Sequence, residues 1–196
     1  MIEYRDFENT STYLDTMGMG IHNRRLRIKI PEAKEVLKRG IIYFCGKSDI
    51  SWVEGYDKIA EWLADNNGRG LLLMGGCGLG KSIITTKVLP VLFKHYYDKI
   101  LSVYYADRIN KTYTEAETRK LVVIDDIGVE GEANTFGDKR MVMKEVVDYA
   151  ERTGQLLILS TNLTAEELEQ KYDVRTMDRL RAITKCIVLD GESNRH

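Results

Sequence analysis

The sequence predicts an α/β fold in which helices cover both faces of a parallel sheet. Short runs that begin with four apolar residues, such as 121–125 and 156–161, have the composition of strands that are buried on both faces. Amphipathic stretches with helical spacing alternate with these runs along the chain. In addition, a glycine-rich turn follows the apolar run 70–74 and leads directly into a helical stretch.

Length and composition indicate one globular domain. The chain has 196 residues, 43% of them hydrophobic and 30% charged, and its net charge of −1 gives no overall argument for nucleic acid or a membrane surface. No apolar run reaches the length of a membrane span, and the first residues lack a signal-peptide pattern, so we expect a cytoplasmic protein. The three scattered cysteines and three histidines predict reduced thiols and no transition-metal site.

The first 50 residues differ from the rest, and we expect residues 1–50 to be an arm or small appendage to a domain at 51–196. They contain a basic stretch at 22–29, then a short helix that Pro31 opens and Gly40 closes. The basic stretch has the chemistry to contact phosphates, although such a short run is more often a solvated arm.

From residue 51 the elements follow one another clearly. Five helices are expected, and the residues Thr164 and Glu167 form a capping box for one of them. Pro90 should end or kink the helix that begins at Lys81, near Leu89. The expected helices are 51–63, 81 to about 97, a helix marked by Met143, Val146, Val147 and Ala150, 165–172, and 175–181. Ser51 is the expected cap of the first of these helices. The expected strands are 70–76, 100–106, 121–125, 156–161 and 185–190.

A phosphate-binding loop lies between the first strand and the helix after it. Residues 75–82, GGCGLGKS, match the pattern G-x-x-x-x-G-K-[ST] in full, whereas a chance Lys-Ser after a glycine turn would rarely have this context. Backbone N–H groups of such a loop surround phosphates, Lys81 reaches the β and γ oxygens, and Ser82 ligates Mg²⁺. The predicted nucleotide-binding residues are Gly75, Gly76, Cys77, Gly78, Leu79, Gly80, Lys81 and Ser82.

Polar side chains at the ends of two other strands complete the predicted site. Asp125 ends the run LVVID and is expected to hold the magnesium shell. Asp126 is expected beside the attacking water, with a solvated surface position as the alternative. Asn162, after LLILST, is predicted to orient that water or sense the γ-phosphate, since Thr164 is the better cap for the next helix. Arg175, Arg179 and Arg181 are candidates for an arginine delivered to a neighbouring protomer.

The motifs GGCGLGKS, VIDDIGVE, STNLTAEEL, RTMDRLR and GESNR, in this order, resemble AAA+ ATPases of the DnaC/DnaI helicase-loader and IstB transposition-helper branch. The resemblance implies that Lys81 and Ser82 are the Walker A pair and that Asn162 is sensor 1. It also implies Asp125 and Asp126 as the Walker B pair, Arg179 as the arginine finger and Arg195 as sensor 2. ATP and Mg²⁺ are the implied cofactors, and the implied partners are a replicative helicase or transposase, single-stranded DNA, and further copies of the chain, with no membrane.

These observations favour an ATPase that loads or remodels a replicative helicase or a related DNA-processing machine. Asp126 stands where the family has Glu, and only about 14 residues, 107–120, connect the second strand to the Walker B strand. A weakly hydrolysing, nucleotide-gated binding module or an IstB-like helper is therefore the alternative. A P-loop kinase for a small metabolite is the third hypothesis, although no arginine-rich lid is evident.

Overall fold

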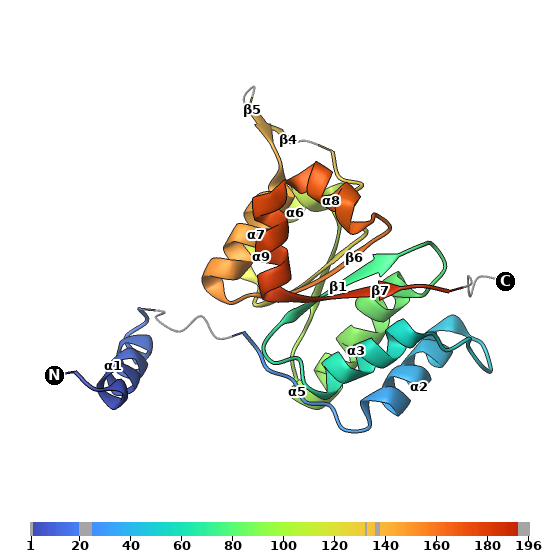
Figure 1. Ribbon diagram of the computed structural model, residues 1–196, viewed down its shortest axis with the longest axis horizontal. Coiled ribbons are helices and arrows are strands. Elements are labelled where there is room, and N and C mark those ends of the chain that lie inside the picture. Colours follow the sequence, from blue (N-terminus) through green and yellow to red (C-terminus); the bar gives the residue numbers. More distant parts are fainter. Residues whose placement is uncertain (1, 20–24, 132, 136–137, 192–196) are drawn as a thin grey trace.

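A five-stranded parallel sheet with helices on both faces forms the body of the molecule, which confirms the predicted fold class (Figure 1). The computed structural model describes residues 2–19, 25–131, 133–135 and 138–191. The strand order is β2-β3-β6-β1-β7. The strands are β1 (Gly70–Gly75), β2 (Ser102–Tyr105), β3 (Leu121–Asp125), β6 (Leu156–Thr161) and β7 (Thr184–Leu189).

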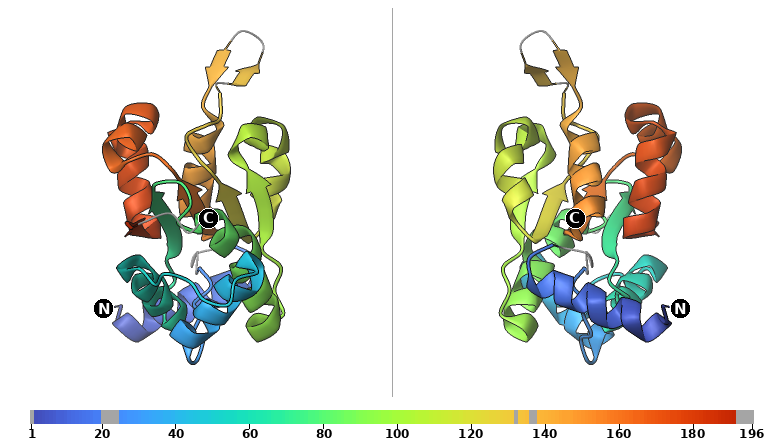
Figure 2. Two further views of the ribbon diagram at one scale, coloured as in Figure 1. Left: turned by 90° about the vertical axis from the view of Figure 1, so that its right-hand side faces the viewer. Right: turned by 90° about the vertical axis from the view of Figure 1, so that its left-hand side faces the viewer.

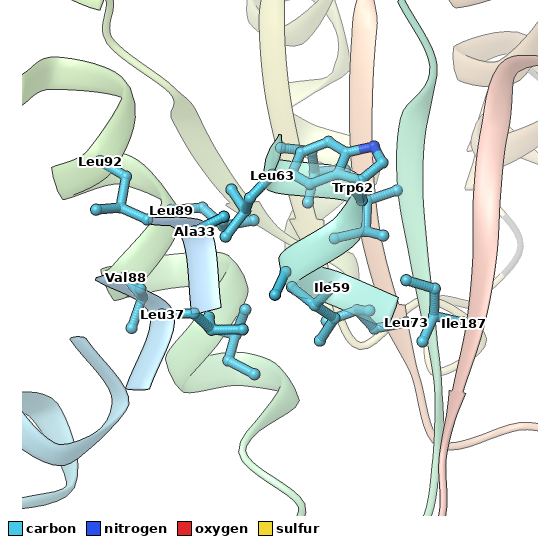
Figure 3. Close-up of a cluster of buried hydrophobic side chains, with 14 of the residues drawn as sticks. Ala33, Leu37, Ile59, Trp62, Leu63, Leu73, Val88, Leu89, Leu92 and Ile187 are labelled. Carbon is cyan, nitrogen blue, oxygen red and sulfur yellow. The ribbon is translucent and has the colours of Figure 1, made fainter. Parts of the chain in front are cut away.

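Alternate residues of each strand face the two helical layers. In β1, Leu71 and Leu73 belong to one buried cluster and Leu72 and Met74 to the other. Figure 3 shows part of the first cluster, where Ile59 and Ile187 lie near Leu73. The helices of this layer are α2 (Ala33–Cys45), α3 (Glu54–Ala64), α4 (Lys81–Ile83), the π-helical turn η1 (Ile84–Val88) and α5 (Leu89–Tyr97).

The opposite layer contains the short turn η2 and four helices. Leu72, Val122 and Leu159 of the sheet pack against this layer. Its elements are η2 (Ala106–Arg108), α6 (Ile109–Thr118), α7 (Val142–Thr153), α8 (Ala165–Tyr172) and α9 (Val174–Ile183). A small antiparallel hairpin, β4 (Ala133–Thr135) and β5 (Asp138–Arg140), projects from the body between β3 and α7 (Figures 1 and 2). Within the described ranges, no helix combines the length and apolar character needed to cross a bilayer.

Packing of the core extends upstream of residue 51, the domain boundary expected from the sequence. Ile28, Leu37 and Ile41 are fully or almost fully buried. The extended segment before α2 is bound to the end of α3, where Ile30 N donates to Leu63 O at 2.9 Å and Ile28 N donates to Asn66 Oδ1 at 2.9 Å. Among the described helices, only α1 (Tyr4–Thr16) stands apart from the body, and none of its residues is buried (Figure 1).

Gly40 lies inside α2 and does not end it, contrary to the prediction. The helix continues to Cys45, and Gly46 ends it in the left-handed conformation with φ 66°. A Cβ atom on Gly40 would lie 2.7 Å from Cγ1 of Val88 in η1. Gly40 therefore allows α2 and η1 to pack closely, because a side chain there would clash with the β-branched Val88, which has little rotamer freedom.

Pro90 also fails to interrupt its helix. α4, η1 and α5 follow one another without a break from Lys81 to Tyr97, and Pro90 occupies the first turn of α5. Proline lacks an N–H and its ring clashes with the carbonyl four residues earlier. The π-helical turn at residues 84–88 widens the helix just before the proline, which is a common way to accommodate such a residue.

The structure also differs from the sequence-based expectations at the start of α3 and in the polar stretch 107–120. Helix α3 begins at Glu54 with Val53 in the capping position, so Ser51 is not its cap. Residues 109–118 form helix α6, which buries only Ile109, Tyr113 and Ala116. Its weak apolar stripe explains why the sequence indicated no helix there.

Candidate functional site

A cleft of about 320 Å³ lies where β1, β3 and β6 end, and it contains most of the predicted site. These three strands are neighbours in the parallel sheet, so their carboxyl ends meet at one edge. The lining includes Cys77, Gly78, Gly80, Lys81, Ser82, Asp126 and Asn162, all of them predicted from the sequence.

The glycine-rich loop adopts a conformation that its sequence requires. Gly75 has φ 139°, and a Cβ atom there would lie 2.1 Å from the carbonyl oxygen of Leu189 in β7. Gly78 and Gly80 also have positive φ, at 88° and 73°. Only glycine adopts such angles without strain. The loop therefore turns tightly between β1 and α4, which begins at Lys81.

Lys81 is buried and its ammonium group is hydrogen-bonded within the site. Nζ donates to the carbonyl oxygens of Gly75 and Gly76, both at 2.7 Å, and to Oδ1 of Asn162 at 2.8 Å. Asn162 Nδ2 in turn donates to Oδ1 of Asp126 at 2.8 Å. The amide of Asn162 thus bridges Lys81 of the phosphate loop and Asp126 at the end of β3.

Asp125 is buried at 6% exposure, and its charge is compensated by hydroxyl groups. Its Oδ1 accepts hydrogen bonds from Thr85 Oγ1 at 3.2 Å and from Ser160 Oγ. The Ser160 oxygen also accepts the backbone N–H of Asp126 at 2.9 Å. Asp126 itself has φ 62°, so the chain turns sharply between the two carboxylates. One serine at the end of β6 therefore contacts both acidic residues.

The oxygen groups near the cleft fit a magnesium ion better than a transition metal. Mg²⁺ is typically held by one or two protein oxygens together with phosphate and water. Ser82 lines the cleft with an exposed side chain, and Asp125 ends β3, which is separated from β1 by β6. Among the described residues, no group of three or more His, Cys, Asp or Glu side chains is arranged to hold a metal ion. Ser82 and Asp125 would thus supply protein oxygen ligands for Mg²⁺, and bound phosphate would supply further ones.

The predicted arginines lie away from the cleft of their own chain. Arg179 on α9 forms ion pairs with Asp148 and, at 3.0 Å, with Glu151, both on α7. Arg181 pairs with Glu169 at 3.2 Å, and Arg175 is exposed at the start of α9. Arg195, the predicted sensor 2 residue, lies outside the described residues.

The sequence interpretation missed several residues that shape the site. Ile41 and Cys45 of α2 line the cleft, although their segment was expected to be an appendage. Tyr56 was assigned only to an apolar helix face, yet its hydroxyl donates to Leu79 O at 3.1 Å and supports the phosphate loop. Thr85 could have been found from its position one helical turn after Lys81, and its hydroxyl donates to Asp125 Oδ1 at 3.2 Å.

Comparison with known proteins gives matches among solved structures. No protein-family model and no curated protein sequence matches the chain. The crystal structure of DnaI superposes with a TM-score of 0.60 at 16% identity, covering 83% of this chain and 93% of DnaI. The DnaC helicase loader gives a TM-score of 0.58 at 12% identity, covering 72% of this chain and 93% of that one. AMPPCP-bound DnaA from Aquifex aeolicus gives 0.51 at 18% identity, covering 72% of this chain and 49% of DnaA.

At these identities the likeness concerns the fold. The parallel sheet and the glycine-rich loop at the end of β1 have the arrangement of P-loop nucleotide-binding proteins. The chain therefore has the fold of the AAA+ P-loop NTPases, and its resemblance to the DnaC helicase loader and to DnaI is confirmed at the level of that fold.

Proposed function

We propose that this chain is a DnaC-like ATPase that binds ATP with Mg²⁺ and loads or remodels a replicative helicase or a related DNA-processing machine. The observation that carries the proposal is the hydrogen-bonded series Lys81, Asn162 and Asp126 across one cleft, beside the buried Asp125. These residue types are those that bind phosphate and position water in P-loop ATPases. The helicase-loader role rests on the likeness to DnaC and DnaI.

Each of the predicted site residues is assigned a role in this proposal. Lys81 exchanges its carbonyl partners for the β and γ oxygens of ATP, and the backbone of residues 75–80 surrounds the phosphates. Ser82 and Asp125 would hold Mg²⁺, which when bound would supply positive charge next to the phosphates. Asp126 and Asn162 orient the attacking water. Arg179 of a neighbouring copy, and Arg195 from the C-terminal side, are proposed to contact the nucleotide as well.

Nucleotide binding and hydrolysis are tested with two variants. We expect Lys81→Ala to weaken binding of a fluorescent ATP analogue by at least about 100-fold, because it removes the ammonium group from the phosphate site. Asp126→Ala should bind the analogue normally and lose at least about 100-fold in phosphate release with single-stranded DNA and the host helicase present. Normal ATP binding by Lys81→Ala would contradict the proposed site.

The loading role needs its own measurement. The chain with ATP should form a complex with the replicative helicase of its host and increase the amount of helicase on a closed single-stranded DNA circle. Lys81→Ala provides the matched control. Phosphate transfer from ATP to a small acceptor rather than to water would instead identify a kinase.

A nucleotide-gated binding module with little hydrolysis is the second candidate. It is favoured by Asp126, which is one methylene shorter than Glu and already accepts a hydrogen bond from Asn162. If this candidate is correct, Asp126→Ala should still engage the partner in an ATP-dependent manner and wild-type turnover should be close to background. Asp126→Glu should then raise the rate of phosphate release.

A further inference from the structure

A second concave surface lies at the opposite end of the sheet from the nucleotide cleft. Strand β3 begins there at Leu121 and ends at Asp125 beside the cleft. The groove has a volume of about 420 Å³. Leu26, Ile100 and Leu121 supply apolar surface, and Ile100 is 75% exposed.

The groove is also strongly basic. Lys99, Arg119 and Lys120 line it, and no acidic side chain is among its lining residues. Arg119 pairs with Glu115 at 3.4 Å, whereas Lys99 and Lys120 form no ion pair with any side chain of the described part of the chain. The surface therefore combines exposed apolar area with positive charge, which suits an acidic amphipathic segment.

Helix α1 has the complementary properties. It has 13 residues and buries none of them, although Tyr4 and Phe7 are 85% and 61% exposed. Tyr4 and Phe7 are three residues apart, and Phe7 and Leu14 are seven apart. All three therefore lie on one side of the helix. Glu8 and Asp15 follow the same spacing beside this apolar stripe. A helix of this length is marginal in water without tertiary contacts, so its apolar stripe requires a partner surface.

We propose that α1 of one copy docks into the basic groove of a second copy. Phe7 and Leu14 would contact Ile100 and Leu121, while Glu8 and Asp15 would face the lysines at the rim. A second copy is favoured over the same chain because α1 stands away from its own body (Figure 1).

The same contact repeated between copies is head-to-tail, so it builds a ring or an open filament rather than a symmetric dimer. Because one helix buries a small area, the association should be weak, in the micromolar range. This inference goes beyond the proposed ATPase function and does not depend on it.

Charge reversal with rescue tests the contact in the nucleotide-free full-length chain. Sedimentation equilibrium should show self-association that weakens by at least about tenfold in Lys99→Glu/Lys120→Glu. Glu8→Lys/Asp15→Lys should weaken it similarly, and mixing the two double variants should restore it. The matched control Asn9→Lys/Thr12→Lys, on the polar side of α1, should have little effect.

Several results would overturn the proposal. A wild-type chain that stays monomeric to about 100 μM, well above a weak interface constant, would do so. Association that survives both reversals, or a mixture of the two that fails to recover, would do so as well. The α1 variants keep the test valid if the groove variants unfold, because α1 contributes no buried residue to the body.

Disulfide trapping separates a second copy from the same chain. In a background with Cys45, Cys77 and Cys186 replaced by Ser, Phe7→Cys and Ser102→Cys place one thiol on α1 and one in the groove. Mild oxidation of a mixture of the two single-cysteine chains should give covalent heterodimers. Oxidation of a chain that carries both thiols should give covalent oligomers. A monomer with an internal disulfide would show docking within one chain and overturn the proposal.

Discussion

The Ser160 hydroxyl connects the two carboxylates of the site, and this position can be tested alone. Ser160→Ala removes a donor to Asp125 and leaves the N–H of Asp126 without its acceptor. An unsatisfied buried group costs about 1–3 kcal/mol, so we expect that loss in the free energy of unfolding. We also expect a higher Mg²⁺ requirement and a lower kcat for phosphate release, because both acidic residues lose their position.

Thr85→Val is the matched comparison for Ser160→Ala. It removes the other hydroxyl donor to Asp125 but leaves Asp126 untouched. It should therefore raise the Mg²⁺ requirement with little effect on kcat at saturating Mg²⁺. Equal kcat values for Ser160→Ala and the wild type at saturating Mg²⁺ would show that Ser160 does not position Asp126.

At the scale of single elements, helix α9 depends on an ionised cap. Asp173 precedes the helix, accepts the N–H of Thr176 at 2.9 Å, and pairs with Lys144 of α7 at 2.7 Å. The hydrogen bond from Lys144, followed by that from Thr176, lowers the pKa of Asp173 from 3.8 to about 2. A lowered pKa in the folded state adds stability above pH 3.8, and that stability is lost as the pH falls toward 2.

Urea unfolding between pH 6 and pH 2.5 measures this contribution. Asp173→Asn keeps a cap acceptor but has no charge, so it should be less stable than the wild type at pH 6. The difference between the two proteins should shrink as the pH falls below about 4. Lys144→Ala should return the pKa of Asp173, measured by NMR, toward its ordinary value. A constant difference at every pH would contradict the assignment.

At the scale of the whole molecule, Arg179 must first break its ion pairs within its own chain before it can reach the nucleotide of a neighbouring copy. The side chain of Arg179 is 23% exposed and is shared between Asp148 and Glu151. Ion pairs at the surface contribute about 0–1 kcal/mol each, which a contact with triphosphate can offset. We therefore expect Arg179→Ala to keep ATP binding and to lose the increase of specific activity with protein concentration.

Two variants test whether Arg179 is the arginine that contacts the nucleotide of a neighbouring copy. Asp148→Asn/Glu151→Gln should lower the protein concentration at which ATPase activity begins, because Arg179 no longer has carboxylate partners on α7. Arg175→Ala should have little effect if Arg179 is the finger. Loss of activity only in Arg175→Ala would transfer the role to Arg175, the exposed arginine at the start of α9.

The sequence predicted local features of the fold better than contacts between distant segments. β3 and β6 have the predicted bounds because each starts with four consecutive apolar residues and ends in polar ones. Burial of Ile28 depends on Asn66, 38 residues away, so no local pattern reveals it. In the site, the phosphate loop was evident from eight consecutive residues, whereas the shared hydroxyl of Ser160 depends on strands β3 and β6 lying side by side.

The hydrogen bonds of Lys81 affect the free energy of phosphate binding. In the structure its ammonium group already has three oxygen partners, the carbonyls of Gly75 and Gly76 and the amide of Asn162. Phosphate binding at this position is therefore an exchange of one set of oxygen partners for another. The measured affinity reports the difference between the two sets, and any change that loosens Asn162 alters that difference without touching the ligand. The carbonyl oxygens of Gly75 and Gly76 and the amide oxygen of Asn162 thus compete with phosphate for Lys81.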